Sequence, residues 1–325
     1  MHLPTLDAIE HAATVIRPWC PPTPQYAWPL LAARAGCEVW VKHENHTPIG
    51  AFKVRGGLHY LHRLQASGRA CAGLISATRG NHGQSLALAA RAFGVPVTIV
   101  VPHGNSREKN ASMRALGARL LEIGNDFEDA RLAAVELAAR EGLEMVPSFH
   151  PDLVTGVATY GLEFLRAAPP LEAVFVGIGL GSGACGLLAA RAALGLSTKI
   201  IGVVAAGAPT YALSLAAGRP VPTQEARTLA DGLACRTPAA EALALMQGAL
   251  DRIEQVSDAR IAAAMRYYYQ DTHNLAEGAG AAALAALLDA PECRPGARLG
   301  VVLSGGNVDR DVFAPILAAG GAGAS

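Results

Sequence analysis

The chain has 325 residues, of which 51% are hydrophobic and 17% charged, and its formal net charge is zero. This length suits one large domain or two of moderate size. The balanced charge offers no basic surface for DNA, RNA or an anionic membrane, so we expect neither nucleic acid nor a membrane as a partner.

The six cysteines are scattered and form no CxxC pair, so we expect no metal site and no disulfide framework. The N-terminus lacks a basic segment followed by an apolar one, and no uninterrupted run of about 18 apolar residues occurs. We therefore predict a cytoplasmic protein without a transmembrane helix.

Short apolar runs alternate with alanine-rich helical segments along the chain. The pattern predicts strands over residues 38–42, 73–77, 97–102, 119–123, 173–176, 199–204 and 300–303. It predicts helices over residues 54–67, 84–93, 105–116, 126–141, 184–194, 258–270 and 278–288. Residues 208–232 are the most irregular segment. Several strands are apolar on both faces, and the alternation predicts an α/β fold with parallel sheets and right-handed crossovers.

Glycines are concentrated in “VFVGIGLGSGACG”, residues 174–186, between a predicted strand and a predicted helix. They let backbone N–H groups approach an anion closely, and the helix N-terminus adds a favourable dipole. Gly179, Gly181 and Ala184 match the dinucleotide fingerprint G-x-G-x-x-A, but no acidic residue follows about 20 positions later to bind a ribose. We therefore interpret the loop as a site for a single phosphate monoester. A tight turn that binds nothing is the alternative.

Lys53 stands between Phe52 and Val54 in “GAFKVRGG”, at the start of a predicted helix. Apolar neighbours suggest burial, which lowers the pKa of an amine and lets it act as a nucleophile or a base. A lysine at a helix start, with its aliphatic stem along the surface, explains the pattern equally well.

Two further polar loops, “SATRGNHG” and “SGGNVD”, follow predicted strands. Ligands of parallel sheets bind beyond the carboxyl ends of the strands, so these loops and the glycine loop predict one converging site. Three ordinary turns are the alternative. A buried lysine, a phosphate loop, an asparagine loop and a terminal Ser-Gly-Gly-Asn are together the parts needed to hold pyridoxal 5'-phosphate through a Schiff base.

The chain resembles the fold-type II pyridoxal-phosphate enzymes, in the serine/threonine dehydratase and serine racemase branch. The matching pieces occur in the family's order: “GAFKVRGG”, “GNHGQS”, “GIGLGSG”, “TLADG”, “AEGAGAAAL” and “VVLSGGNVD”. The resemblance implies a two-domain α/β fold like that of the tryptophan synthase β subunit, each domain an open, mostly parallel sheet flanked by helices. We expect a smaller domain over 50–150, a larger domain over 1–49 plus 151–325, and the active site between them.

The resemblance also assigns roles to residues that match the family's motifs. Lys53 would form the Schiff base and then act as the base at the substrate Cα. Asn81 would hydrogen-bond the phenolic oxygen of the cofactor, and Ser304 would lie at its pyridine nitrogen. The roles of Asp231 and Glu277 stay open. The other expected cofactor contacts are Phe52, Gly177, Gly179, Gly181, Ser182 and Gly183, and the expected substrate contacts are Thr78, Arg79, Gly80, Asn81 and His82.

The implied reaction eliminates water from a β-hydroxy-α-amino acid of the threonine or serine type, 3-hydroxyaspartate and 3-phenylserine included, and yields a 2-oxo acid and ammonia. The alternatives are an amino-acid racemase, a β-replacement enzyme and a non-catalytic binding protein. His82 argues against β-replacement, because those relatives carry threonine there, and Lys53 argues against a non-catalytic role. Val204 and Thr210 stand where racemase-like members carry cation-binding carboxylates, so we expect no divalent cation. Relatives are often dimers, which implies a homodimer.

Arg79 departs from the family, which carries alanine or serine at this position. In racemases that serine transfers a proton, and an arginine is almost always protonated, so the substitution disfavours racemisation. Three interpretations stay open. Arg79 pairs with a distal carboxylate of the substrate, stacks on an aromatic substrate or the cofactor ring, or faces solvent or a nearby acid.

Overall fold

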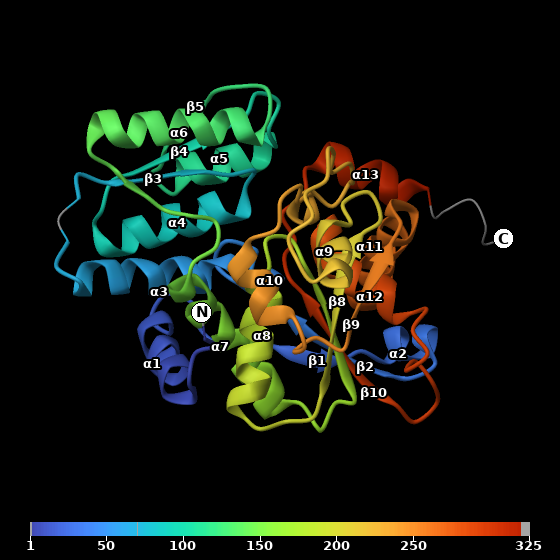
Figure 1. The fold of residues 1–325 in the computed structure, drawn as a ribbon. Coiled ribbons are helices and arrows are strands. Elements are labelled where there is room, and N and C mark those ends of the chain that lie inside the picture. Colours follow the sequence, from blue (N-terminus) through green and yellow to red (C-terminus); the bar gives the residue numbers. More distant parts are fainter. Residues whose placement is uncertain (1, 70, 320–325) are drawn as a thin grey trace.

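The computed structural model describes residues 2–69 and 71–319. Two α/β units lie side by side, each built around its own sheet (Figure 1). The strands are β1 (Gln25–Ala27), β2 (Glu38–His43), β3 (Leu74–Ala77), β4 (Val97–Val101), β5 (Arg119–Glu122), β6 (Glu144–Met145), β7 (Ala173–Gly177), β8 (Lys199–Ala205), β9 (Arg252–Val256) and β10 (Arg298–Leu303).

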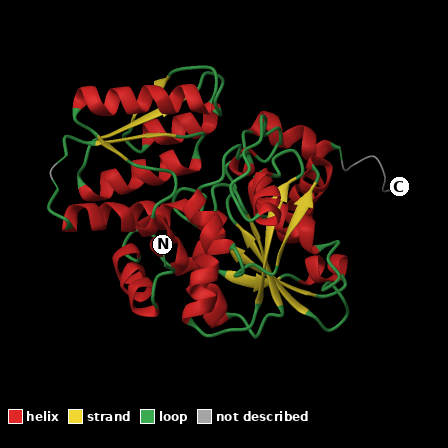
Figure 2. Ribbon diagram, in the orientation of Figure 1, coloured by secondary structure: helices red, strands yellow, loops and turns green. Residues whose placement is uncertain are grey.

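Helices cover both sheets (Figure 2). The α-helices are α1 (Leu6–Ile16), α2 (Pro29–Ala35), α3 (Lys53–Ala66), α4 (Asn81–Phe93), α5 (Arg107–Ala115), α6 (Phe127–Glu141), α7 (Pro151–Ala167), α8 (Ser182–Ala193), α9 (Thr210–Ala217), α10 (Ala240–Met246), α11 (Asp258–Thr272), α12 (Gly278–Leu287) and α13 (Arg310–Ala318). Two short 3-10 helices are η1 (Glu44–His46) and η2 (Asp231–Leu233). No helix of the described residues is long and apolar enough to span a bilayer.

The two sheets are mostly parallel, which confirms the predicted α/β fold. The smaller sheet has the order β5-β4-β3-β6, and every pair in it is parallel. The larger sheet has the order β1-β2-β10-β7-β8-β9, and only β1 runs antiparallel to its neighbour. β3, β4 and most of β7 are buried along their length, as their mostly apolar sequences predict.

Each predicted strand and helix is present, with ends that move by a few residues. The pattern missed the helices α1, α2, α7, α10 and α13 and the strands β1, β6 and β9. In α7, glycines and threonines weaken the helical signal although most of its residues are buried. The segment 208–232, predicted to be irregular, contains the helix α9. The domain boundaries near residues 50 and 150 stay a prediction, because α3 packs both on α4 of the smaller unit and on α7.

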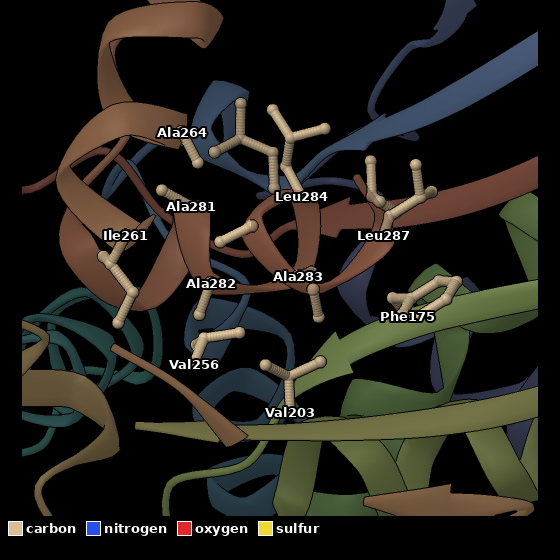
Figure 3. Close-up of a cluster of buried hydrophobic side chains, with 14 of the residues drawn as sticks. Phe175, Val203, Val256, Ile261, Ala264, Ala281, Ala282, Ala283, Leu284 and Leu287 are labelled. Carbon is tan, nitrogen blue, oxygen red and sulfur yellow. The ribbon is translucent and has the colours of Figure 1, made fainter. Parts of the chain in front are cut away.

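The core of the larger unit surrounds α12, whose ten residues are all buried (Figure 3). A helix that is apolar on every side belongs inside a protein. Its alanines let α12 pack closely against the sheet, where Phe175 and Val203 contribute, and against α11, where Ile261 contributes. The residue before this helix is Glu277, whose N–H donates to the Gly305 carbonyl just after β10, so the core also fixes a carboxylate beside the carboxyl end of that strand.

A buried ion cluster fixes the start of α3. The Arg55 guanidinium is fully buried and donates to Glu44 at 2.7 and 2.9 Å and to Glu163 at 2.7 and 2.9 Å. Thr159 accepts a further hydrogen bond at 3.1 Å. Lys42, also buried, donates to Glu163 at 2.7 Å. The positive charges of this cluster are therefore compensated by two carboxylates, as burial of ions requires.

Close contact between α3 and α7 depends on Gly156. A methyl group there would lie 2.8 Å from His59 Cβ and would collide with the backbone carbonyl of Arg55. The absence of a side chain therefore lets α7 hold the first turn of α3 in place.

We expect Gly156→Ala to lower the free energy of unfolding by about 1–3 kcal/mol, because the added methyl group separates the two helices. Urea denaturation measures this change. Thr155→Ala, on the same helix, is the matched control and should change stability by less than about 0.5 kcal/mol. A stabilised Gly156→Ala variant, as helix propensity alone favours, would contradict the packing argument.

Candidate active site

A pocket of about 310 Å³ opens where the two units meet, and it gathers several of the predicted site residues. Its walls contain Lys53, the loop Thr78–His82 and Gly179. Phe52, Gly177, Gly181, Ser182, Gly183 and Ser304 do not line it. The lining also contains Asp231, whose role the sequence left open, and it adds Lys109, Asp126, Phe127, Glu128, Ser148, Leu180, Cys235 and Arg236.

Lys53 has the chemistry of a nucleophile. Burial lowers the pKa of its amine to about 8, against an opposing effect of Glu277. The chain has four lysines, and only Lys53 and Lys109 line the pocket. Lys109 is ion-paired, whereas no carboxylate lies within ion-pairing distance of Lys53 among the described residues. Lys53 is therefore the pocket lysine that can present a neutral amine near neutral pH.

The other expected cofactor residues lie behind the lysine. The Lys53 ammonium stands 4.8 Å from the centre of the Phe52 ring, and Gly183 borders the same ring. The Phe52 N–H donates to the Ser304 carbonyl at 3.0 Å. The Tyr160 hydroxyl donates to the Gly183 carbonyl at 2.7 Å. These contacts join the start of α3, the end of β10 and the start of α8.

The asparagine loop is held by hydrogen bonds across the two units. Asn81 donates to Glu277 at 2.6 Å and accepts from Asn307 at 2.9 Å. One of the two amide hydrogens of Asn81 is left for a ligand. The Thr78 hydroxyl accepts from the Gly80 N–H at 3.0 Å, so it shapes the loop. No side chain caps α4, whose first N–H groups can bind an anion.

His82 is buried in the pocket wall, and its Nε2 has no hydrogen-bond partner among the described residues. Burial lowers the pKa of the ring to about 3, with a further contribution from Lys53. The imidazole is therefore neutral, and Nε2 is available to one ligand atom. A buried polar atom without a hydrogen-bond partner costs free energy. This cost indicates that a bound molecule supplies the partner.

The glycine loop turns from β7 into α8 beside the lysine. Gly181 precedes the helix with φ of 100°, in the left-handed region that favours glycine. A side chain on Gly179 would collide with the Gly232 carbonyl. No side chain caps α8, and the helix begins at Ser182, which is buried. Leu180, which interrupts the run of glycines, lines the pocket.

Lys109 is the main site residue that the sequence analysis missed. It donates to Asp231 at 2.7 Å and lies 3.3 Å from Glu277. Burial opposes its charge, but these two carboxylates outweigh burial and raise its pKa. Burial raises the pKa of Glu277. Helical spacing could have located Lys109. It stands four residues before the buried Met113, so the two side chains lie on the same face of α5.

Arg79 lies at the mouth of the pocket and is exposed. It pairs with no carboxylate within 4 Å among the described residues, unlike most arginines of the chain. The structure brings it near a second arginine, Arg236, which sequence reasoning had not singled out. Of its three interpretations, the exposed side chain fits the one in which Arg79 faces solvent, a close pair with a nearby acid is not observed, and the two substrate contacts stay predictions.

The arrangement suits a small anionic molecule with a reactive carbonyl carbon. A lysine of lowered pKa lines the same pocket as Asn81, which begins α4, and Gly179, two residues before the α8 N-cap Gly181, and no side chain caps either helix. A neutral amine attacks a carbonyl, and the two helix ends offer N–H groups to anions. In the part of the chain that the structure describes, no three His, Cys, Asp or Glu side chains cluster as metal ligands.

Comparison with known proteins agrees with this chemistry. The family model “Pyridoxal-phosphate dependent enzyme” matches residues 16–305. A putative threonine dehydratase of Sinorhizobium fredii is 35% identical over 316 residues, 96% of this chain and 95% of that protein. An L-threo-3-hydroxyaspartate ammonia-lyase of Pseudomonas sp is 32% identical over 318 residues, 98% and 99% of the two chains. The structure of maize serine racemase matches with a TM-score of 0.90 and 25% identity over 98% of each chain.

The family match spans most of the length, and the relatives cover nearly the whole chain. The two sheets have the architecture expected of fold type II. This chain therefore belongs to the pyridoxal-phosphate dependent enzymes of fold type II.

Proposed function

We propose that this enzyme is an ammonia-lyase that converts a β-hydroxy-α-amino acid to a 2-oxo acid and ammonia. The observation that carries the proposal is Lys53, a buried amine of lowered pKa in the pocket between the units. Relatives named threonine dehydratase and 3-hydroxyaspartate ammonia-lyase, similar over almost the whole chain, support this reaction class.

Lys53, Asn81 and Gly179 of the pocket would hold pyridoxal phosphate together with the rest of the glycine loop and Ser304, which lie outside its lining. Lys53 would hold the aldehyde carbon covalently, and the glycine loop with the N-terminus of α8 would hold the phosphate. Asn81 would give its remaining amide hydrogen to the ring oxygen, and Ser304 would contact the ring nitrogen. The unpartnered Nε2 of His82 fits a bound molecule at the same place.

When bound, the cofactor supplies an electron-withdrawing ring that stabilises negative charge at the substrate Cα. The uncapped N-terminus of α4 would bind the substrate carboxylate and orient the Cα hydrogen toward Lys53. Lys53, released by the incoming amino group, would remove that proton. The hydroxyl on Cβ leaves with a proton as water. Addition of water to the unsaturated product then releases the 2-oxo acid and ammonia, so the net reaction consumes no other reagent.

Racemisation is the second candidate, and the likeness to maize serine racemase favours it. Racemisation needs a proton donor on the face of Cα opposite the lysine. Arg79 occupies the expected position, and a guanidinium keeps its proton near neutral pH, so elimination is the better supported reaction. The homodimer that the family resemblance implies stays a prediction.

The proposed reaction is tested by release of 2-oxo acid from a panel of β-hydroxy amino acids, measured with and without Lys53→Ala. We expect turnover by the wild type and at least a hundredfold lower kcat for the variant, since about this much is typical of an acid–base residue. Circular dichroism would confirm that the variant is folded. A wild-type enzyme that retains its cofactor and releases no 2-oxo acid would contradict the proposal.

The pKa of Lys53 predicts how fast the apoenzyme takes up cofactor. Only the neutral amine reacts, so the rate should rise about tenfold per pH unit below 8 and level off above it. The growth of visible cofactor absorption measures the rate. Because Glu277 raises the pKa of Lys53, Glu277→Gln should move the profile to lower pH. A profile centred near the ordinary lysine pKa would show that the amine is not desolvated.

Val204 and Thr210 are buried and offer no carboxylate at the positions of the racemase cation site. We therefore expect that a chelator, followed by addition of magnesium, changes the release of 2-oxo acid by less than about twofold. Activation by magnesium after chelation would place a cation site elsewhere on the chain.

A further inference from the structure

Two exposed guanidinium groups stand at the mouth of the pocket with little to neutralise them. Arg79 comes from the loop between β3 and α4, and Arg236 from the loop between η2 and α10. The nearest carboxylate to Arg236 is Asp126, at 4.0 Å, the outer limit for an ion pair. The Arg236 side chain is 53% exposed.

The remaining charges of the pocket are already paired. Lys109 is bound to Asp231 at 2.7 Å. Glu128 accepts two hydrogen bonds from Arg131, one of them at 2.9 Å. The exposed carboxylates beside the two arginines are therefore Asp126 and Glu128, and Glu128 is already bound to Arg131, so the mouth has fewer free carboxylates than guanidinium groups.

Asp126 also caps the N-terminus of α6. It precedes α6 and accepts from the N–H groups of Glu128 at 2.8 Å and Asp129 at 3.0 Å. These backbone hydrogen bonds lower its pKa, and Arg236 and Arg79 contribute to the same direction. A capping carboxylate cannot turn to bind both guanidinium groups, so each keeps free N–H donors.

The backbones that carry the two arginines are fixed by hydrogen bonds within different units. The Arg236 carbonyl accepts from the Thr223 N–H at 2.8 Å and the Thr210 hydroxyl at 3.2 Å, in the larger unit. The Thr78–Gly80 hydrogen bond shapes the loop of Arg79 in the smaller unit. A ligand bound by both arginines would thus contact both units at once.

We propose that Arg79 and Arg236 form a subsite for a second, distal carboxylate, so that the preferred substrate is a dicarboxylic β-hydroxy-α-amino acid. This inference rests on the proposed function and narrows its substrate class. The α-carboxylate would occupy the N-terminus of α4, and the β-carboxylate would face outward to the two guanidiniums. Charge-assisted hydrogen bonds to a planar carboxylate are the strongest that an arginine makes.

The test compares threo-3-hydroxyaspartate, threonine and threo-phenylserine with the wild type, Arg79→Ala, Arg236→Ala and the double variant. Each single variant should lower kcat/KM for 3-hydroxyaspartate about 10- to 100-fold, as expected for a lost hydrogen bond to a charged group. For threonine the change should stay within about twofold. Arg140→Ala, which removes an exposed arginine near the other end of α6, is the control for net charge. It should leave kcat/KM unchanged for both substrates.

Asp126→Asn tests whether the charge of Asp126, and not its role as a helix cap, affects substrate binding. Asparagine keeps the helix cap, but it removes the charge that competes with the substrate. We expect kcat/KM for 3-hydroxyaspartate to rise about 1.5- to 5-fold, the range of an exposed ion pair. An unchanged or lower value would contradict competition by Asp126. Equal losses for threonine and 3-hydroxyaspartate in the arginine variants, or a loss confined to phenylserine, would overturn the subsite.

Binding alone distinguishes a failed subsite from a failed reaction. L-Aspartate and L-alanine carry no β-hydroxyl, and their binding to the holoenzyme changes its visible absorption without elimination of water. If the wild type eliminates water from no substrate, the proposed function fails, but the subsite still predicts a Kd for aspartate about tenfold higher in Arg79→Ala and Arg236→Ala. An equal change for alanine would overturn the subsite on its own.

Discussion

The position of the reactive amine depends on a buried guanidinium two residues further along the helix. The Arg55 guanidinium donates hydrogen bonds to the carboxylates of Glu44 and Glu163 and to the hydroxyl of Thr159. These acceptors come from separate segments of the sequence. Removal of one partner from such a network typically costs about 3–5 kcal/mol, because the other charge is left buried and alone. The cluster therefore fixes the first turn of α3, and with it the backbone of Lys53, in one place.

A second set of charges joins the two units at the pocket itself. Lys109 of the smaller unit lies between Asp231 and Glu277 of the larger one, and Glu277 in turn holds Asn81. Glu277 is placed by α12, so the apolar core of the larger unit determines where the asparagine loop of the smaller unit stands. Polar contacts thus align the two halves of the site, whereas hydrophobic burial holds each half together.

The sequence predicts the fold well where local pattern and tertiary role agree. The buried strands β4 and β7 are short, mostly apolar runs, and their positions follow from that pattern. The helix α7 escaped prediction, because its glycines serve a contact with α3 that no local pattern contains. Motif order locates Lys53 and Asn81, but Lys109 and Arg236 reach the pocket only through folding of distant segments. Their roles depend on which carboxylates lie nearby, and that is set by tertiary structure.

The strand order has a consequence for how the chain is made. β10 lies between β2 and β7 at the centre of the larger sheet, yet it is the last strand to be synthesised. In a chain that lacks β10, the edges of β2 and β7 that β10 covers are unpaired, and unpaired strand edges are templates for aggregation. The hydrogen bond from Phe52 to Ser304 forms only when this strand is in place. The neighbour of the reactive lysine is thus held in place only after β10 has joined the sheet, so a segment far along the chain from Lys53 completes its surroundings.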